Sequence, residues 1–232
     1  MMQRAAGALE HLDRFIEASE LPAYLADLDR LNAWFGGYAL TRRQVDRMVA
    51  TVPRDHPTRI ADIGGGRGDL AVRLVRSARA ARRAVRVIVV DRDAASVGLG
   101  QLAWEAYPEI VFVQADATAL PFRDRGVDVA VMSLTLHHLE PNAAVASLGA
   151  MRRVARLGVA VNDLLRSRLW LWLVWLATRV FAGHPYSRDD GPLSVRRAYA
   201  PDEVRVLARR AGFDDLTIRR YPMLARLMAI GA

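Results

Sequence analysis

The chain has 232 residues, with 33 basic residues (Lys or Arg) against 25 acidic ones, a formal net charge of +8 and no cysteine. Without cysteine, disulfide scaffolds, cysteine-ligated zinc and thiol catalysis are excluded. Hydrophobic residues make up 52% and charged residues 25%, a balance that favours a packed core over disorder. At roughly 150 residues per domain, the length predicts one domain with an elaboration.

The first residues and the longest apolar run bear on where the protein works. The segment from Met1 to Gly7 lacks the apolar stretch of a secretory signal, so a cytoplasmic protein is expected. The run from Leu169 to Thr178 has about half the length that a bilayer-crossing helix needs. We therefore expect no membrane span.

The positive charge comes from arginine alone, because the chain contains no lysine. Exclusive use of arginine is more typical of a GC-rich genome than of selection for phosphate contacts, and the arginines are scattered. Pairs lie at Arg42-Arg43, Arg82-Arg83, Arg152-Arg153 and Arg209-Arg210. This pattern favours a solvated surface, with nucleic-acid binding as the alternative that a pI of about 10.8 suggests.

The N-terminal region, residues 8–52, carries apolar residues at helical spacing. Leu9, Leu12, Phe15 and Ile16 form one stripe, and the stretch from Leu21 to Phe35 forms a second. Gly36 and Gly37 are expected to end the second helix. Thr41, with Gln44 three residues later, has the form of the N-cap of a third helix. We therefore predict a helical cap over residues 1–57, ahead of a main domain at 58–232.

From residue 58 onward, short apolar strands alternate with helices. Strands are predicted at Arg59–Ile63, Arg86–Asp91, Ile110–Val113, Val127–Met132 and Leu157–Val161, and helices at Asp69–Ala80, Ala94–Tyr107 and Pro141–Val154. Beyond them we expect a helix at Leu164–Phe181, a polar loop to Ala198, a helix from Pro201 to Gly212, and strands near Leu216–Arg219 and Leu224–Met228. This alternation predicts an α/β fold with a parallel sheet and helices on both faces. Residues 164–198 would then cover the substrate side.

A glycine-rich turn follows the first predicted strand, at the sheet edge where open α/β folds bind ligands. Its spacing is D-x-G-x-G-x-G, formed by Asp62, Gly64, Gly66 and Gly68. The dinucleotide fingerprint would need glycine or alanine at the position of Asp69. A carboxylate ending the strand suits a ligand with an ammonium group better than a pyrophosphate.

Four motifs in this order resemble the class I S-adenosylmethionine-dependent methyltransferases, over residues 59–213. They are the glycine turn, Val89-Val90-Asp91, Gln114-Ala115-Asp116-Ala117, and a strand-four region with Leu120-Pro121-Phe122, Val127 to Ser133 and Leu136-His137-His138-Leu139. The last of these is similar to the ubiquinone and menaquinone branch. Tyr199 to Val204, leading to Ala211-Gly212-Phe213, is similar to the family's last helix.

The resemblance implies a Rossmann-like, seven-stranded, mostly parallel sheet whose last strand is antiparallel, with S-adenosyl-L-methionine as cofactor. The turn with Asp62, Gly64, Gly66 and Gly68 would hold the methionine part of the cofactor. Asp91 would bind the two ribose hydroxyls, and the carboxylate of Asp116 the adenine amino group. Arg92, Ala117 and Ser133 are further candidates for cofactor binding. For Asp91 and Asp116 the alternative is a turn-forming aspartate.

Three histidines are candidates for the group that removes a proton from the methyl acceptor. His137 and His138 end strand four, and we favour His137 because adjacent residues are not expected to point inward together. The alternative is that one caps a helix and the other packs. His184 begins the polar segment 184–194, which is expected either to contact substrate or to be a solvated loop. Asn162 and Asp163 are expected to face the same cleft or to cap the helix beginning at Leu164.

The helix around Trp170, Trp172 and Trp175 is apolar all round, which is typical of a core helix. A lipophilic substrate pocket and a contact between two copies in a homodimer are its alternatives.

The function expected is methyl transfer to an oxygen or carbon of a small apolar, aromatic molecule such as a phenol, quinol or polyketide, in secondary metabolism. An RNA methyltransferase and a non-catalytic S-adenosylmethionine-binding protein remain the alternatives. No metal is expected.

Overall fold

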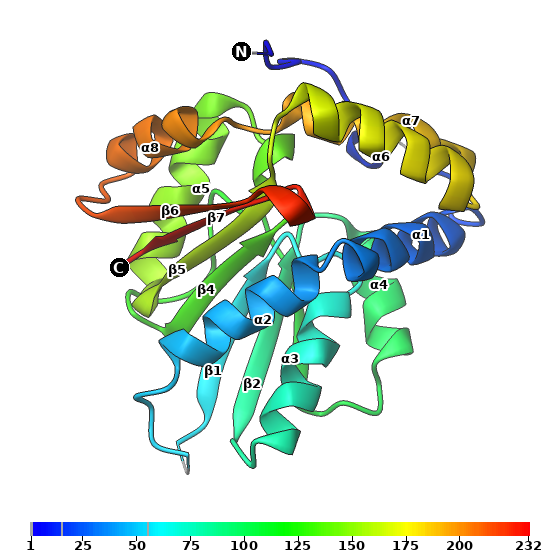
Figure 1. The fold of residues 1–232 in the computed structure, drawn as a ribbon. Helices are drawn as coiled ribbons and strands as arrows, with labels where there is room; N and C mark the ends of the chain where they lie inside the picture. The colour runs from blue at the N-terminus through cyan, green and yellow to red at the C-terminus, as the bar shows by residue number, and fades with distance from the viewer. Residues whose placement is uncertain (1, 15, 55) are drawn as a thin grey trace.

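A computed structural model describes residues 2–14, 16–54 and 56–232 and contains one seven-stranded sheet (Figure 1). The strands are β1 (Thr58–Ile63), β2 (Val85–Asp91), β3 (Ile110–Gln114), β4 (Val127–Ser133), β5 (Ala155–Leu164), β6 (Leu216–Tyr221) and β7 (Arg226–Gly231). Their order is β3-β2-β1-β4-β5-β7-β6. The first five pair in parallel, and β7 is antiparallel to both neighbours, β5 and β6. The predicted sheet is thereby confirmed.

Helices cover both faces of the sheet and its upper edge. They are α1 (Leu21–Trp34), α2 (Gly37–Met48), α3 (Asp69–Ala80), α4 (Ala94–Ala103), α5 (Pro141–Val154), α6 (Arg168–Phe181), α7 (Pro185–Arg197) and α8 (Pro201–Arg210). Helices α2, α3 and α4 pack on one face, and α5 and α8 on the other. Helices α1, α6 and α7 gather beyond the carboxyl ends of the parallel strands (Figure 1).

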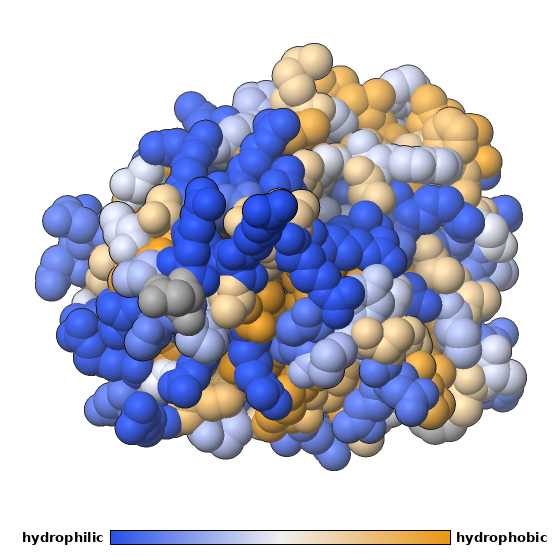
Figure 2. Space-filling view, turned by 90° about the horizontal axis from the view of Figure 1, so that it is seen from below, coloured by the Kyte–Doolittle hydropathy of each residue, from blue (hydrophilic) through white to orange (hydrophobic). Residues whose placement is uncertain are grey.

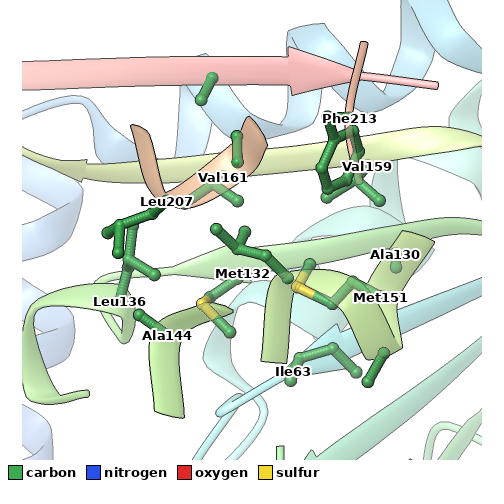
Figure 3. Packing of buried hydrophobic residues seen from close by; sticks show 14 of the residues in the cluster. Ile63, Ala130, Met132, Leu136, Ala144, Met151, Val159, Val161, Leu207 and Phe213 are labelled. Atoms are coloured by element: carbon green, nitrogen blue, oxygen red, sulfur yellow. The ribbon is translucent and has the colours of Figure 1, made fainter. Parts of the chain in front are cut away.

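The core is split by the sheet into two clusters, because successive strand residues point to opposite faces. In β4, Val129 and Val131 pack toward α2 and α3, whereas Ala130 and Met132 pack toward α5 and α8. Figure 3 shows the second cluster, in which Met132 lies among side chains of α5, β5 and α8. Strands buried on both faces need continuous apolar runs, which is why their positions are readable from sequence.

The N-terminal region departs from the predicted helices. Residues 8–16 contain only a short 3-10 turn, His11–Asp13, while Phe15 lies outside the described residues. One turn is enough for Leu12 and Ile16 to reach a small apolar cluster that α1 provides. Thr41 is not an N-cap, because α2 already begins at Gly37. Gly36 adopts a left-handed φ of +68°, which lets the chain start the next helix at once.

The segment between β5 and α8 also differs from expectation. Strand β5 continues to Leu164, so α6 begins only at Arg168. The polar segment expected to be a loop is helix α7, despite Pro192 in its interior. This helix buries Ser187, Asp190 and Val195. Tertiary contacts therefore overcome the poor helix propensity of this segment.

Candidate active site

The glycine turn joins β1 to α3 and bends tightly around the end of the strand. Gly64, Gly66 and Gly68 have φ angles of +68°, +53° and +83°, which residues with a Cβ rarely adopt. The Gly66 N–H donates a hydrogen bond of 2.7 Å to Oδ2 of Asp91. The turn and the end of β2 are thus held together.

Asp62 lies beneath this turn and is 1% exposed. Its Oδ2 has no hydrogen-bond partner in the structure. Burial raises the pKa of Asp62 to about 7, and the negative charges of Asp91 and Asp69 add to the effect. A buried carboxylate oxygen without a partner is suited to a cationic group of a ligand, as an ammonium would be.

Two adjoining cavities open around the turn and bring most of the predicted cofactor residues together. A cavity of about 140 Å³ is lined by Gly64, Gly66, Asp91, Arg92, Asp116 and Ala117. A second, of about 210 Å³, shares the glycine turn and adds Asp62 and Ser133. Gly68 lines neither cavity and instead is the N-cap of α3. Asp116 accepts hydrogen bonds at Oδ1 from both the N–H and the hydroxyl of Thr118, so it also shapes its own turn.

The larger cavity has an apolar wall opposite the glycine turn. Helix α1, the residues after it, the end of β5 and helix α6 supply Tyr24, Leu25, Leu28, Leu31, Phe35, Leu164 and Val174. The polar lining gathers near the carboxyl ends of β4 and β5. A cavity with apolar walls and a few convergent polar groups is typical of small-molecule sites.

His137 lines this cavity and is fixed by Asp163 at the end of β5. Its Nδ1 lies 2.6 Å from Oδ1 of Asp163, and its backbone N–H donates to Oδ2 at 2.9 Å. Burial alone would raise the pKa of Asp163, but the facing His137 ring and the hydrogen bonds hold it below the usual value. Because the ionised carboxylate can only accept, Nδ1 carries a proton and Nε2 is left to accept one.

His138 points the same way as His137, so the expectation that only one could face inward is wrong. The ring centroids are 4.3 Å apart, and the two Nε2 atoms lie 3.6 and 3.7 Å from the oxygens of Glu10. Asp13 holds Nδ1 of His138 at 3.0 Å. Both rings converge because the N-terminal segment places Glu10 between them.

Glu10, His137 and His138 are residue types that bind metal ions, and their ligand atoms lie within 4.8 Å of one another. However, the guanidinium of Arg197 lies 3.5 Å from Oε1 of Glu10 and also pairs with Asp13. Burial raises the pKa of Glu10 to about 7, against the opposing effect of His138 and Arg197. The guanidinium of Arg197 therefore already offsets the negative charge of this cluster.

His184 and Asn162, which were predicted near the substrate, lie outside the cavities. His184 lines neither cavity and is the N-cap of α7, where its Nδ1 accepts the N–H of Tyr186 at 3.3 Å. Asn162 neither lines the cavity nor caps a helix. Its Nδ2 donates to Oγ1 of Thr41 at 2.8 Å and to the Gly37 carbonyl at 3.1 Å, which ties α2 to the sheet.

The tryptophans of α6 form neither the core nor the cavity wall. Trp172 and Trp175 are 56% and 40% exposed, while Trp170 meets Phe35 edge-on at 6.5 Å. Val174 and Thr178 are the α6 residues that line the cavity. Within the described part of the chain, no helix is both long and apolar enough to cross a membrane.

Sequence reasoning missed several residues around the larger cavity, above all Glu10, Asp13, Arg197 and Arg226. Each comes from a segment far from the glycine turn in sequence. The one signal that the sequence offers is a charged residue in an apolar stretch, as for Arg226 in the last strand. Such isolated charges are seldom buried unless they are paired or functional.

Comparison with known proteins places this chain in a family. A family model described as a methyltransferase domain matches residues 60–158. A demethylmenaquinone methyltransferase of Roseiflexus castenholzii is 32% identical over 177 residues, which are 69% of this chain and 70% of that protein. The chain belongs to the S-adenosylmethionine-dependent methyltransferases. It is therefore an enzyme that uses S-adenosylmethionine. This methyltransferase is also 25% identical to a UbiE protein of Xylella fastidiosa, in an alignment that covers 72% of the present chain.

Solved structures agree on the fold. The CurJ carbon methyltransferase aligns with a TM-score of 0.67 at 15% identity, covering 93% of this methyltransferase and 61% of that chain. The CMeT domain of the citrinin polyketide synthase aligns with a TM-score of 0.65 at 12% identity, covering 84% of this chain and 51% of that one. This methyltransferase thus spans only part of the length of either chain.

The cofactor affinity of this methyltransferase should depend on pH through Asp62. The buried carboxyl has a pKa of about 7, raised by burial, Asp91 and Asp69, and an ammonium group favours its ionised form. We expect the dissociation constant of S-adenosylmethionine to rise by up to roughly tenfold for each pH unit below about 7. Calorimetry between about pH 6 and about pH 7.5 measures this. Asp62→Asn should bind weakly with no such slope, and a pH-independent wild-type affinity would contradict the assignment.

Proposed function

We propose that this methyltransferase methylates an oxygen or an acidic carbon of a small apolar, aromatic molecule. The observation that carries the proposal is the cavity of about 210 Å³ that runs from Asp62 and the glycine turn to His137 between apolar walls. S-adenosylmethionine supplies an electrophilic methyl group when it is bound. The protein then has to align the acceptor, exclude water and remove a proton.

His137 is the proposed base. The residue lines the cavity, Asp163 fixes the ring through Nδ1 at 2.6 Å, and Nε2 lies 3.6 Å from Oε1 of Glu10, which lines the same cavity. When Nε2 takes the proton of an acceptor hydroxyl, the ring becomes a cation that the Asp163 carboxylate stabilises. A buried Asp–His pair of this kind orients the base and supports its charged form.

The acceptor class follows from the cavity wall and from the relatives. Leucine, phenylalanine and tyrosine side chains on one side of the cavity suit a flat apolar ring. Relatives of this chain are named for demethylmenaquinone or for ubiquinone and menaquinone biosynthesis. Both points support a phenol, quinol or related polyketide acceptor, with either an oxygen or a carbon as the methylated atom.

The arginine-rich surface lies away from this cavity. Arg59, Arg123, Arg125 and Arg156 line a surface hollow near the amino ends of β1, β4 and β5. Figure 2 shows the molecule from below, where hydrophilic side chains dominate the surface. Because the proposed active site is at the carboxyl ends of the same strands, these arginines are poorly placed to deliver RNA to it.

Salt dependence separates a small-molecule acceptor from RNA. We expect methyl incorporation into phenols or quinols to change little between 50 and 200 mM salt, because burial of apolar surface drives their binding. Nucleic-acid binding through six to ten phosphate contacts would weaken by roughly 10³ to 10⁵ over that range. The measurement is transfer of labelled methyl from S-adenosylmethionine to each acceptor class. Efficient labelling of RNA, with a steep loss in salt, would overturn the proposal.

A further inference from the structure

Arg226, the first residue of β7, is a buried cation that forms no ion pair with the described residues. It is 2% exposed, faces the larger cavity and lies opposite Leu164 in the sheet. Its Nη2 donates to Oδ1 of Asn32 at 3.0 Å, whereas Nε and Nη1 have no hydrogen-bond partner among the described residues. Burial lowers the pKa of Arg226 to about 10, so the guanidinium is still charged at neutral pH.

Two other buried arginine side chains of this protein have the carboxylate partner that Arg226 lacks. Arg166 pairs with Glu203 at 2.8 Å, and Arg197 pairs with Asp13. Among residues 2–14, 16–54 and 56–232, no carboxylate lies within 4.0 Å of the Arg226 guanidinium. A buried charge without a partner destabilises a fold, and a retained one points to a partner from outside the chain.

We infer that Arg226 binds a negatively charged oxygen that a ligand brings into the cavity. Two ligands of the proposed reaction carry such an oxygen. One is the acceptor, as a phenolate, enolate or carboxylate, and this case rests on the proposed function. The other is the methionine carboxylate of S-adenosylmethionine, whose ammonium group is expected near Asp62.

The position of Arg226 fits either source. Arg226 and Asp62 line the same cavity. The methionine part of S-adenosylmethionine carries an ammonium and a carboxylate, so the ammonium could pair with Asp62 and the carboxylate with Arg226. The negative charge of Asp163, which holds His137, raises the pKa of Arg226 against the effect of burial. A guanidinium on this side of the base would stabilise the oxyanion that forms when the acceptor loses its proton.

Paired probes test the inference. S-adenosylmethionine is compared with its decarboxylated analogue, and 4-nitrophenol is compared with nitrobenzene in the presence of S-adenosylhomocysteine. Arg226→Met should weaken the anionic member of one pair by about tenfold or more and leave the other member unchanged, because a charge-assisted hydrogen bond is lost. The pair that responds identifies the source of the oxygen. Arg226→Lys should recover part of the affinity.

Arg166→Met is the matched control, because it removes a buried arginine outside the cavity. It should lower the melting temperature and leave probe affinities unchanged, whereas Arg226→Met should keep or raise the melting temperature. Unchanged affinity of the Arg226 variants for both anionic probes, or equal losses for charged and neutral probes, would overturn the inference. Failure of the proposed function is distinguishable, because it would show as no methylated small acceptor while the probe pairs still respond.

Discussion

Replacement of His137 by alanine is expected to lower turnover by roughly 10² to 10⁴ while leaving the affinity for S-adenosylmethionine nearly unchanged. The buried ring lines the larger cavity with Nδ1 bound to Asp163, and Nε2, 3.6 Å from Oε1 of Glu10, is the nitrogen that we propose takes the proton of an acceptor. Single-turnover rates with a phenolic acceptor, measured beside calorimetric cofactor binding, separate loss of chemistry from loss of the site.

Two variants serve as controls for this result. Asp163→Asn keeps the shape of the pair but removes the charge that fixes the ring, so it should also lower turnover. His184→Gln changes the N-cap of α7 outside the cavity and should leave turnover close to that of the wild type. Wild-type turnover of His137→Ala across about pH 6 to about pH 9 would assign this histidine to packing, and His138 would be tested next.

Replacement of Gly66 by valine is expected to weaken S-adenosylmethionine binding by about 10²-fold or more. Gly66 has a φ of +53°, which is strained for a β-branched residue, and it lines both cavities, where a Cβ would meet no atom within 4 Å. Asp91→Ala removes the acceptor that holds the turn and should act in the same direction. Calorimetry with S-adenosylmethionine and with NAD measures both effects.

Gly98 offers a matched control on α4. A Cβ at this position would also meet no atom within 4 Å, but its φ is not in the left-handed region and it lines neither cavity. Gly98→Ala should therefore leave cofactor affinity unchanged. Tight binding of NAD by the wild type, or full S-adenosylmethionine affinity in Gly66→Val, would contradict the assignment of the glycine turn.

Elements with strong local signals could be predicted from the sequence. The strands β1 to β5 are continuous apolar runs because both faces of the sheet are covered, and the glycine turn needs residues that accept a positive φ. Parallel topology then places the ends of these strands at one edge. For that reason the residue pattern alone predicts that Gly64, Gly66, Asp91 and Asp116 lie together, and they line one cavity.

Local signals are misleading where tertiary contacts determine the conformation. Helix α7 contains Pro192 and many polar residues, yet it forms because its buried side packs against α1 and α6. Glu10 belongs to a segment whose spacing predicts an amphipathic helix, but in the structure it lies between His137 and His138. Neither result follows from periodicity, which reports only which face of an element is apolar.

The sequence by itself determined the fold class, because strands and helices follow from residue types at short and regular spacing. Its motifs, through their resemblance to a known family, also indicated the cofactor and predicted the edge of the sheet that holds the proposed active site. Only the tertiary structure decided the pairing of His137 with Asp163, the position of His184 outside the cavity and the burial of Arg226 without an ion-pair partner among the described residues. Each of these depends on segments more than 20 residues apart in the chain, or on which of several equivalent polar residues faces the cavity. Burial and pairing are properties of the folded arrangement, and a list of residues does not contain them.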